Sequence, residues 1–147
     1  MAVSKAKYLI DLHGLREAFS TKNNHVRVAV IDAIEAGELL IVRSASDELK
    51  DIDEPAYESF QSSVSKKKYI KTASKHEATA ASLINSYGAS IFGVSPPAAR
   101  FEAVAVCVCE KLDLVTSGKS HSECKKIVSK CKLSKPKVLS VDEFAKL

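Results

Sequence analysis

The chain has 147 residues, of which 46% are hydrophobic and 27% are charged. This length suffices for one compact domain with a sizeable core, and the composition is unlike that of disordered proteins. The net charge is +4, and no apolar run approaches the roughly 20 residues of a membrane-spanning helix. We therefore expect a single domain over residues 1–147 with no membrane segment. The first residues lack the apolar core of a secretory signal, so we expect a cytoplasmic protein.

Hydrophobic patterning predicts alternating strands and helices. In chain order we expect a strand at 7–11, a helix at 25–38, a strand at 38–42, helices at 44–52 and 54–64, a strand at 68–72, helices at 75–88 and 95–112, a strand at 112–116, a helix at 122–131, a strand at 137–141 and a helical turn at 141–147. Alternation of this kind predicts a three-layer α/β/α fold with a short, mostly parallel central sheet.

Several residues mark the expected ends of these helices. Gly37 is expected to stop the first helix, and Ser44 or Ser46 to cap the second. Pro55 lies in the first turn of the third helix, where proline is tolerated. Asp142 is expected to start the last helical turn.

The chain has four cysteines, Cys107, Cys109, Cys124 and Cys131. Because no secretory signal is recognised, disulfide pairing is not expected. His121, Cys124 and Cys131 resemble a zinc site only in part, because they lack the paired close spacing of zinc fingers and ribbons. We therefore expect reduced structural thiols.

Lysines are concentrated in two stretches of the chain. Residues 66–75 contain five lysines and no acid, and residues 119–137 contain seven lysines against the single acid Glu123. The region between Asp32 and Glu58 is acidic instead. Basic stripes beside acidic clusters suit a surface that attracts a phosphate backbone, and solvated helix faces explain the same pattern equally well.

Three acidic residues are expected to meet at one edge of the predicted sheet, because ligands of parallel sheets bind beyond the carboxyl ends of the strands. Asp11 ends the first strand, Glu48 follows the second, and Glu102 lies near the start of the long apolar helix. Converging carboxylates repel one another unless a cation lies between them, and Mg²⁺ and Mn²⁺ prefer oxygen ligands. The sequence therefore predicts a divalent metal site.

Taken together, these segments resemble the PIN-domain nucleases over nearly the whole chain. The resemblance lies in "YLID" ending on Asp11, "SASDEL" containing Glu48, "RFEAVAVCVCEKLDLVT", and the closing "KCKLSKPKVLSVDEF". It implies that Asp11, Glu48 and Glu102 are the metal ligands and catalytic residues of a Mg²⁺- or Mn²⁺-dependent endoribonuclease. It also implies the toxin of a toxin–antitoxin pair, with RNA as substrate, an antitoxin or other protein regulator, and a homodimer.

The chain departs from the family pattern at several positions. The third acid is usually an aspartate, whereas this chain has Glu102, and Gly118 stands where a fourth acid often follows. Leu12 replaces a small polar residue, with His13 beyond it. A second interpretation is therefore a catalytically degenerate PIN-like module that binds nucleic acid or a protein partner. A Rossmann-type or flavodoxin-like nucleotide binder ranks low, since Gly14 alone follows the first strand instead of a glycine-rich loop.

Each candidate ligand also has a purely structural interpretation. Asp11 could cap a helix that begins at "GLREAF". Glu102 could form a surface ion pair with Arg100. Glu48 belongs to an acidic run, in which another member could face inward: Asp47, Asp51 or Asp53.

Further residues are candidates for holding the RNA backbone: Ser117, Lys119, Lys66, Lys67 and Lys68. Ser117, with Thr116 before it, could instead cap a helix, and the lysines could simply be solvated. His13 is expected to be a turn residue beside Gly14.

Overall fold

A computed structural model of the chain describes residues 6–87, 96–131 and 135–147. The elements in chain order are β1 (Tyr8–Ile10), α1 (Leu12–Ser20), α2 (Asn24–Glu35), β2 (Leu39–Val42), α3 (Arg43–Ile52), α4 (Glu54–Ser63), β3 (Tyr69–Ile70), α5 (Ser74–Tyr87), α6 (Ala98–Glu110), β4 (Asp113–Thr116), α7 (Gly118–Ser129), β5 (Val138–Ser140) and α8 (Val141–Ala145). All five predicted strands are present, although β3 is only two residues long.

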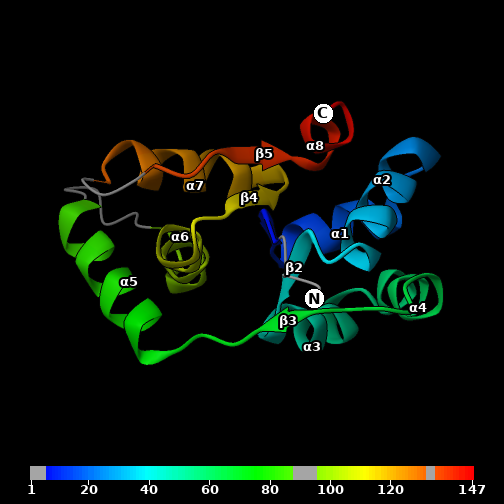
Figure 1. Cartoon of the computed structure of the whole chain (residues 1–147), viewed down its shortest axis with the longest axis horizontal. Coiled ribbons are helices and arrows are strands. Elements are labelled where there is room, and N and C mark those ends of the chain that lie inside the picture. Colours follow the sequence, from blue (N-terminus) through cyan, green and yellow to red (C-terminus); the bar gives the residue numbers. More distant parts are fainter. Residues whose placement is uncertain (1–5, 88–95, 132–134) are drawn as a thin grey trace, which may run out of the picture.

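The five strands form one sheet in the order β3-β2-β1-β4-β5, and every neighbouring pair is parallel. Helices α5, α6 and α7 cover one face of this sheet, and α1, α2, α3, α4 and α8 cover the other (Figure 1). The predicted three-layer α/β/α fold is therefore confirmed. In the described residues, no helix is both long and apolar enough to cross a membrane.

Each face of the sheet has its own apolar core. Ile10 and Val115 pack with the helices of the α1 side, whereas Leu9 and Leu114 pack with those of the α6 side. Adjacent strand residues point to opposite faces, so a strand buried on both faces must be apolar throughout. This requirement explains why the strands are short, continuous apolar runs.

The predicted capping residues of two helices and the predicted start of a third are wrong. Helix α3 begins directly after β2, with Val42 as its N-cap, so Ser44 and Ser46 lie inside the helix. Helix α8 is capped by Ser140, which forms a capping box with Glu143, and Asp142 lies within the first turn. Helix α7 begins at Gly118, four residues before its predicted start.

The other predicted helix boundaries agree more closely with the structure. Gly37 follows the end of α2 with a φ of 78°, a left-handed conformation that favours glycine. Pro55 lies in the first turn of α4, as predicted. The proposed ends at Gly88 and Ser95 lie outside the described residues.

The four cysteines form no disulfide among themselves. Cys107, Cys124 and Cys131 are buried, and Cys109 is partly exposed. Burial raises the pKa of Cys107 well above its usual value and the pKa of Cys124 to about 12. Both thiols therefore stay protonated at neutral pH, which agrees with the structural role expected of them.

The interface between α5 and α6 contains a polar cluster of Lys75, His76 and Glu110. The backbone N–H of Ala73 donates to Nδ1 of His76 at 2.9 Å, so the ring proton lies on Nε2 and faces Glu110 Oε2 at 2.8 Å. Lys75 Nζ lies 2.8 Å from the same oxygen. These hydrogen bonds, from Lys75 first and then His76, lower the pKa of Glu110.

We expect Glu110→Gln to reduce the free energy of unfolding by about 1 kcal/mol at pH 7. Because the pKa of Glu110 is lowered in the folded protein, its contribution is complete above the unfolded value of about 4.3 and disappears as pH falls through the folded value. Denaturant unfolding between pH 7 and acid pH should therefore show the two stability curves converging. Glu58→Gln, on an exposed residue of α4, is the control, and curves of wild type and Glu110→Gln that stay parallel would contradict the prediction.

Candidate functional site

A small cavity lies at the carboxyl ends of β1 and β2, where it is closed by the start of α6. Its volume is about 50 Å³, enough for a few waters or an ion but not for a nucleotide. Asp11, Glu48 and Glu102 all line it. The fold thus gathers carboxylates from three distant segments at the edge of the sheet where ligands of parallel sheets bind.

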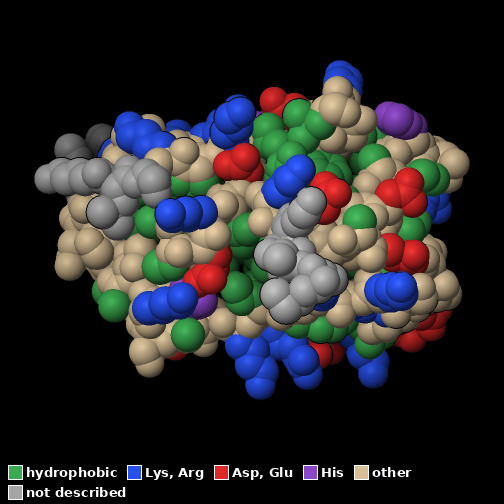
Figure 2. Space-filling model, viewed as in Figure 1, with side chains coloured by type: hydrophobic (Ala, Val, Ile, Leu, Met, Phe, Trp, Pro, Cys, Tyr) green, Lys and Arg blue, Asp and Glu red, His purple; other side chains and the backbone are tan. Residues whose placement is uncertain are grey.

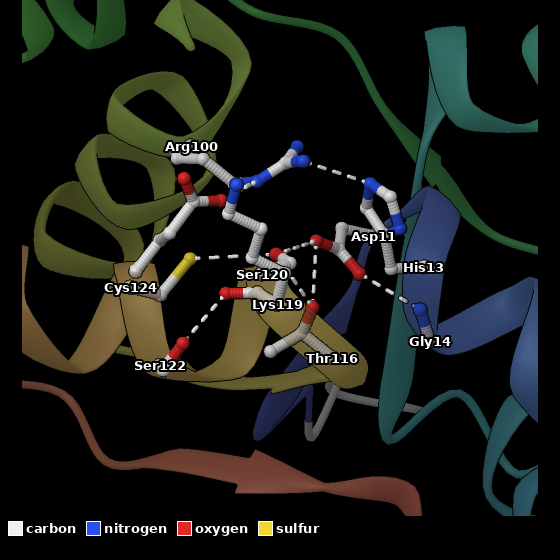
Figure 3. Close-up of polar contacts among 10 residues, drawn as sticks. Asp11, His13, Gly14, Arg100, Thr116, Lys119, Ser120, Ser122 and Cys124 are labelled. Carbon is white, nitrogen blue, oxygen red and sulfur yellow. Dashed lines mark hydrogen bonds and ion pairs between the residues drawn. The ribbon is translucent and has the colours of Figure 1, made fainter. Parts of the chain in front are cut away.

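Asp11 is the most firmly held of the three acids. It is only 7% exposed, and its Oδ1 accepts a hydrogen bond from the backbone N–H of Gly14 at 2.9 Å. Its Oδ2 accepts from the hydroxyls of Thr116 at 2.9 Å and Ser120 at 3.1 Å (Figure 3). Asp11 therefore does cap α1, as its structural interpretation held, while also lining the cavity.

The hydroxyls that hold Asp11 come from β4 and α7. Thr116 is the last residue of β4 and Ser120 lies one turn later, and both are fully buried. Their oxygens are 2.9 Å apart, and Ser120 Oγ lies 3.7 Å from Cys124 Sγ. The start of α7 thus provides a polar support for Asp11 within an otherwise apolar core.

Glu48 and Glu102 are exposed at the cavity, and within the described parts of the chain neither has a hydrogen-bond or ion-pair partner. The proposed ion pair between Glu102 and Arg100 is wrong. Arg100 pairs instead with Glu123 on α7, because helix residues two apart do not face each other.

Other members of the acidic run around Glu48 have different roles. Asp53 caps α4 and pairs with Arg16 at 3.1 Å. Asp47 lines a neighbouring hollow, and Asp51 is exposed without lining the cavity. Among these acids, Glu48 is therefore the one that the fold brings to Asp11.

Arg100 connects three helices at the cavity wall. Its Nε donates to Glu123 Oε1 at 3.1 Å, and its Nη2 lies 2.9 Å from Nε2 of His13, in the first turn of α1. A guanidinium can only donate, so Nε2 of His13 accepts and the ring is neutral. Burial lowers the pKa of His13, with Arg100 and Arg16 also lowering it and Asp11 and Glu123 opposing them.

The lysines proposed for RNA binding are not at the cavity. Lys66, Lys67 and Lys68 precede β3 and line a hollow at the amino ends of the strands, the opposite edge of the sheet. Lys119 is exposed in the first turn of α7 and does not line the cavity. On the face shown in Figure 2, lysine and arginine side chains are interspersed with acidic ones.

Ser117 is the N-cap residue of α7, but its side chain makes no capping hydrogen bond. It lines a polar hollow beside the cavity, together with His13, Arg16 and Asp53. Thr116 does not cap the helix either, because its hydroxyl is directed to Asp11 and Ser120. Ser117 therefore occupies the predicted N-cap position without making the capping hydrogen bond, and Thr116 is not a cap.

Of two cations near the cavity, reasoning from the sequence missed Arg43 and considered Lys71 only as one of the five lysines of residues 66–75. Arg43 and Lys71 line a hollow that shares Val42, Ser44 and Thr72 with the carboxylate cavity. Each cation directly follows a strand, Arg43 after β2 and Lys71 after β3. The strand-end rule that identified Asp11 would have found both of them.

The donor chemistry of the cavity fits Mg²⁺ or Mn²⁺, although the side chains are not yet arranged around an ion. In the described residues, no three His, Cys, Asp or Glu side chains form a group that could hold a metal. Asp11 Oδ1 accepts one hydrogen bond, which leaves it one lone pair for a ligand. Glu48 and Glu102 are exposed at the cavity, and no hydrogen bond or ion pair with a described residue holds either of them away from it.

Comparison with models of known protein families and with curated proteins found no match to this chain.

Proposed function

We propose that the protein is a metal-dependent endoribonuclease whose site is the carboxylate cavity. The observation that carries the proposal is that Asp11, Glu48 and Glu102, from three distant segments, line one cavity at the carboxyl edge of the sheet. The three-layer fold, which the resemblance to PIN-domain nucleases also implies, supports it. Mg²⁺ or Mn²⁺ bound there would supply an activated water and stabilise charge on the phosphodiester.

The three acids would have different roles in metal binding, because Asp11 is held by hydrogen bonds and Glu48 and Glu102 are not. Asp11 is fixed by three hydrogen bonds and would provide the preformed ligand. Glu48 and Glu102 are free to move and would close on the ion from α3 and α6. Because the cavity is too small for a nucleotide, the RNA strand would lie across its mouth, near Arg43 and Lys71.

A specific observation also favours the second interpretation, a PIN-like module without catalysis. Gly118 stands where a fourth acid is expected, and Arg100 places a positive charge in the wall of the cavity. A site with one acid fewer and a resident cation binds a divalent ion more weakly. Such a module would bind RNA without cutting it.

The deciding experiment is cleavage of a labelled single-stranded RNA with Mn²⁺, Mg²⁺ or EDTA. We expect cleavage with a divalent ion and none in EDTA. Asp11→Asn should reduce the rate by at least about 100-fold, since even residues that only support metal ligands cost 10- to 100-fold when changed. Glu48→Gln and Glu102→Gln should each reduce it as well.

Asp51→Asn is the matched control, since Asp51 lies on the same helix as Glu48 but does not line the cavity. Its cleavage rate should equal that of wild type. Cleavage that survives Asp11→Asn would come from a contaminant or another site and would refute the proposal. RNA binding without cleavage under any metal would support the degenerate module instead.

A further inference from the structure

Among the residues that the structure places in the cavity wall, Arg100 carries the sole positive charge, beside three carboxylates. Its side chain is only 15% exposed and belongs to the first turn of α6. A cation is disfavoured at this end of a helix, where the helix dipole is positive. Arg100 breaks this local rule, and such departures are expected mainly at functional sites.

The guanidinium of Arg100 is oriented by partners on both sides of the sheet. Glu123 on α7 and His13 on α1 hold it across the carboxyl edge. Figure 3 shows the guanidinium of Arg100 directed toward His13. These two bonds use two of its five N–H groups, and within the described residues the other three have no partner. The guanidinium is planar and held in one direction, so its three remaining N–H donors are placed to bind the oxygens of a phosphate.

We propose that Arg100 positions a phosphate group of the RNA backbone at the mouth of the cavity, with Glu123 and His13 fixing its guanidinium. This inference rests on the proposed function, because it assumes that RNA lies across the cavity. The phosphate would then lie between Arg100 on one side and the carboxylates on the other. Arg100 would then bind RNA in addition to joining α6 to α1 and α7.

The test is RNA binding in EDTA, where cleavage does not interfere. Fluorescence anisotropy would follow a labelled single strand of about 12 nucleotides, a length within the range of known single-strand sites. We expect Arg100→Gln to weaken binding about 10-fold. The slope of log K against log salt should fall by about 0.7, the value for one phosphate of a single strand that the protein no longer neutralises. Arg100→Lys should keep most of the slope but lose part of the affinity, because lysine has no fork.

Glu123→Gln separates phosphate binding from a purely structural role. This change removes the same ion pair as Arg100→Gln but leaves the contact of Arg100 with His13, so it should lower thermal stability no more than Arg100→Gln does. It removes a negative charge, while the amide oxygen of glutamine can still accept the hydrogen bond from Arg100 Nε, so Glu123→Gln should bind RNA at least as tightly as wild type. Lys111→Gln, at the amino end of β4, is the charge-matched control and should leave affinity and slope unchanged.

Several results would overturn the inference: wild type that does not bind RNA, an Arg100→Gln variant with unaltered affinity and slope, or a Glu123→Gln variant as weak as Arg100→Gln. Thermal unfolding of each variant establishes that it is folded at the assay temperature, and Arg100→Lys remains informative if Arg100→Gln is not. Arg100-dependent binding without metal-dependent cleavage would reject the nuclease alone. Cleavage by wild type with unchanged binding by Arg100→Gln would reject the inference alone.

Discussion

Gly14→Ala is expected to lower the free energy of unfolding by about 3 kcal/mol, more than its side-chain size suggests. A Cβ at this position would lie 2.7 Å from Ile10 Cγ1 and 2.9 Å from the carbonyl oxygen of Val115. That carbonyl belongs to β4 and accepts the backbone N–H of Asp11, so it cannot move without disturbing the sheet edge. Helix α1 would have to shift away from the sheet.

Alanine is favoured over glycine inside a helix by about 1 kcal/mol, which offsets part of the cost. Thermal unfolding should still show a midpoint lower by about 8 °C for a chain of this size. Gly118→Ala is the control, because nothing lies within 4 Å of a Cβ there and only its φ of 63° is unfavourable. It should cost about 1 kcal/mol. Equal losses from the two variants would mean that the close approach at Gly14 is relieved easily.

The same glycine illustrates what the sequence reveals and what it leaves open. The sequence predicts a turn at His13 beside Gly14, whereas both residues lie in α1, and Gly14 is needed there because the helix touches a neighbouring strand. That strand, β4, is about a hundred positions away in the chain. Contacts of this kind depend on the order of strands in the sheet, which hydrophobic patterning does not determine.

Strand-end positions were the most informative signal for the site. Parallel strands end at one edge, so the order of elements alone predicted that Asp11, Glu48 and Glu102 would come together there. The charge of the lysine run at 66–68 suggests a phosphate-binding surface, but the run precedes β3 and therefore lies at the opposite edge of the sheet. The partners of individual side chains are harder to predict from the sequence than the site itself. Arg100, for example, pairs with Glu123 only because α6 packs on α7.

Asp11→Ala is expected to lower the free energy of unfolding by about 2 kcal/mol. Helix α1 would lose its N-cap, which costs about 1 kcal/mol. The buried hydroxyls of Thr116 and Ser120 would lose their shared acceptor, which costs about 1 kcal/mol more, since they can still bond to each other. Asp11→Asn keeps an oxygen for the Gly14 N–H and should cost less than half as much, so it separates charge from structure in the cleavage assay.

A double-mutant cycle with Thr116→Val assigns the hydrogen-bond part of this loss. Valine has the shape of threonine without its hydroxyl, so Thr116→Val alone should cost about 1 kcal/mol. In the Asp11→Ala background it should cost clearly less, because the bond to Asp11 is already absent and only the bond between Thr116 and Ser120 remains to be lost. Denaturant unfolding of the four proteins gives the coupling directly. If Asp11→Ala were more stable than wild type, the buried charge of Asp11, close to Glu48 and Glu102, would destabilise the fold by more than its three hydrogen bonds stabilise it. The presence of an acid at position 11 would then lower the free energy of unfolding.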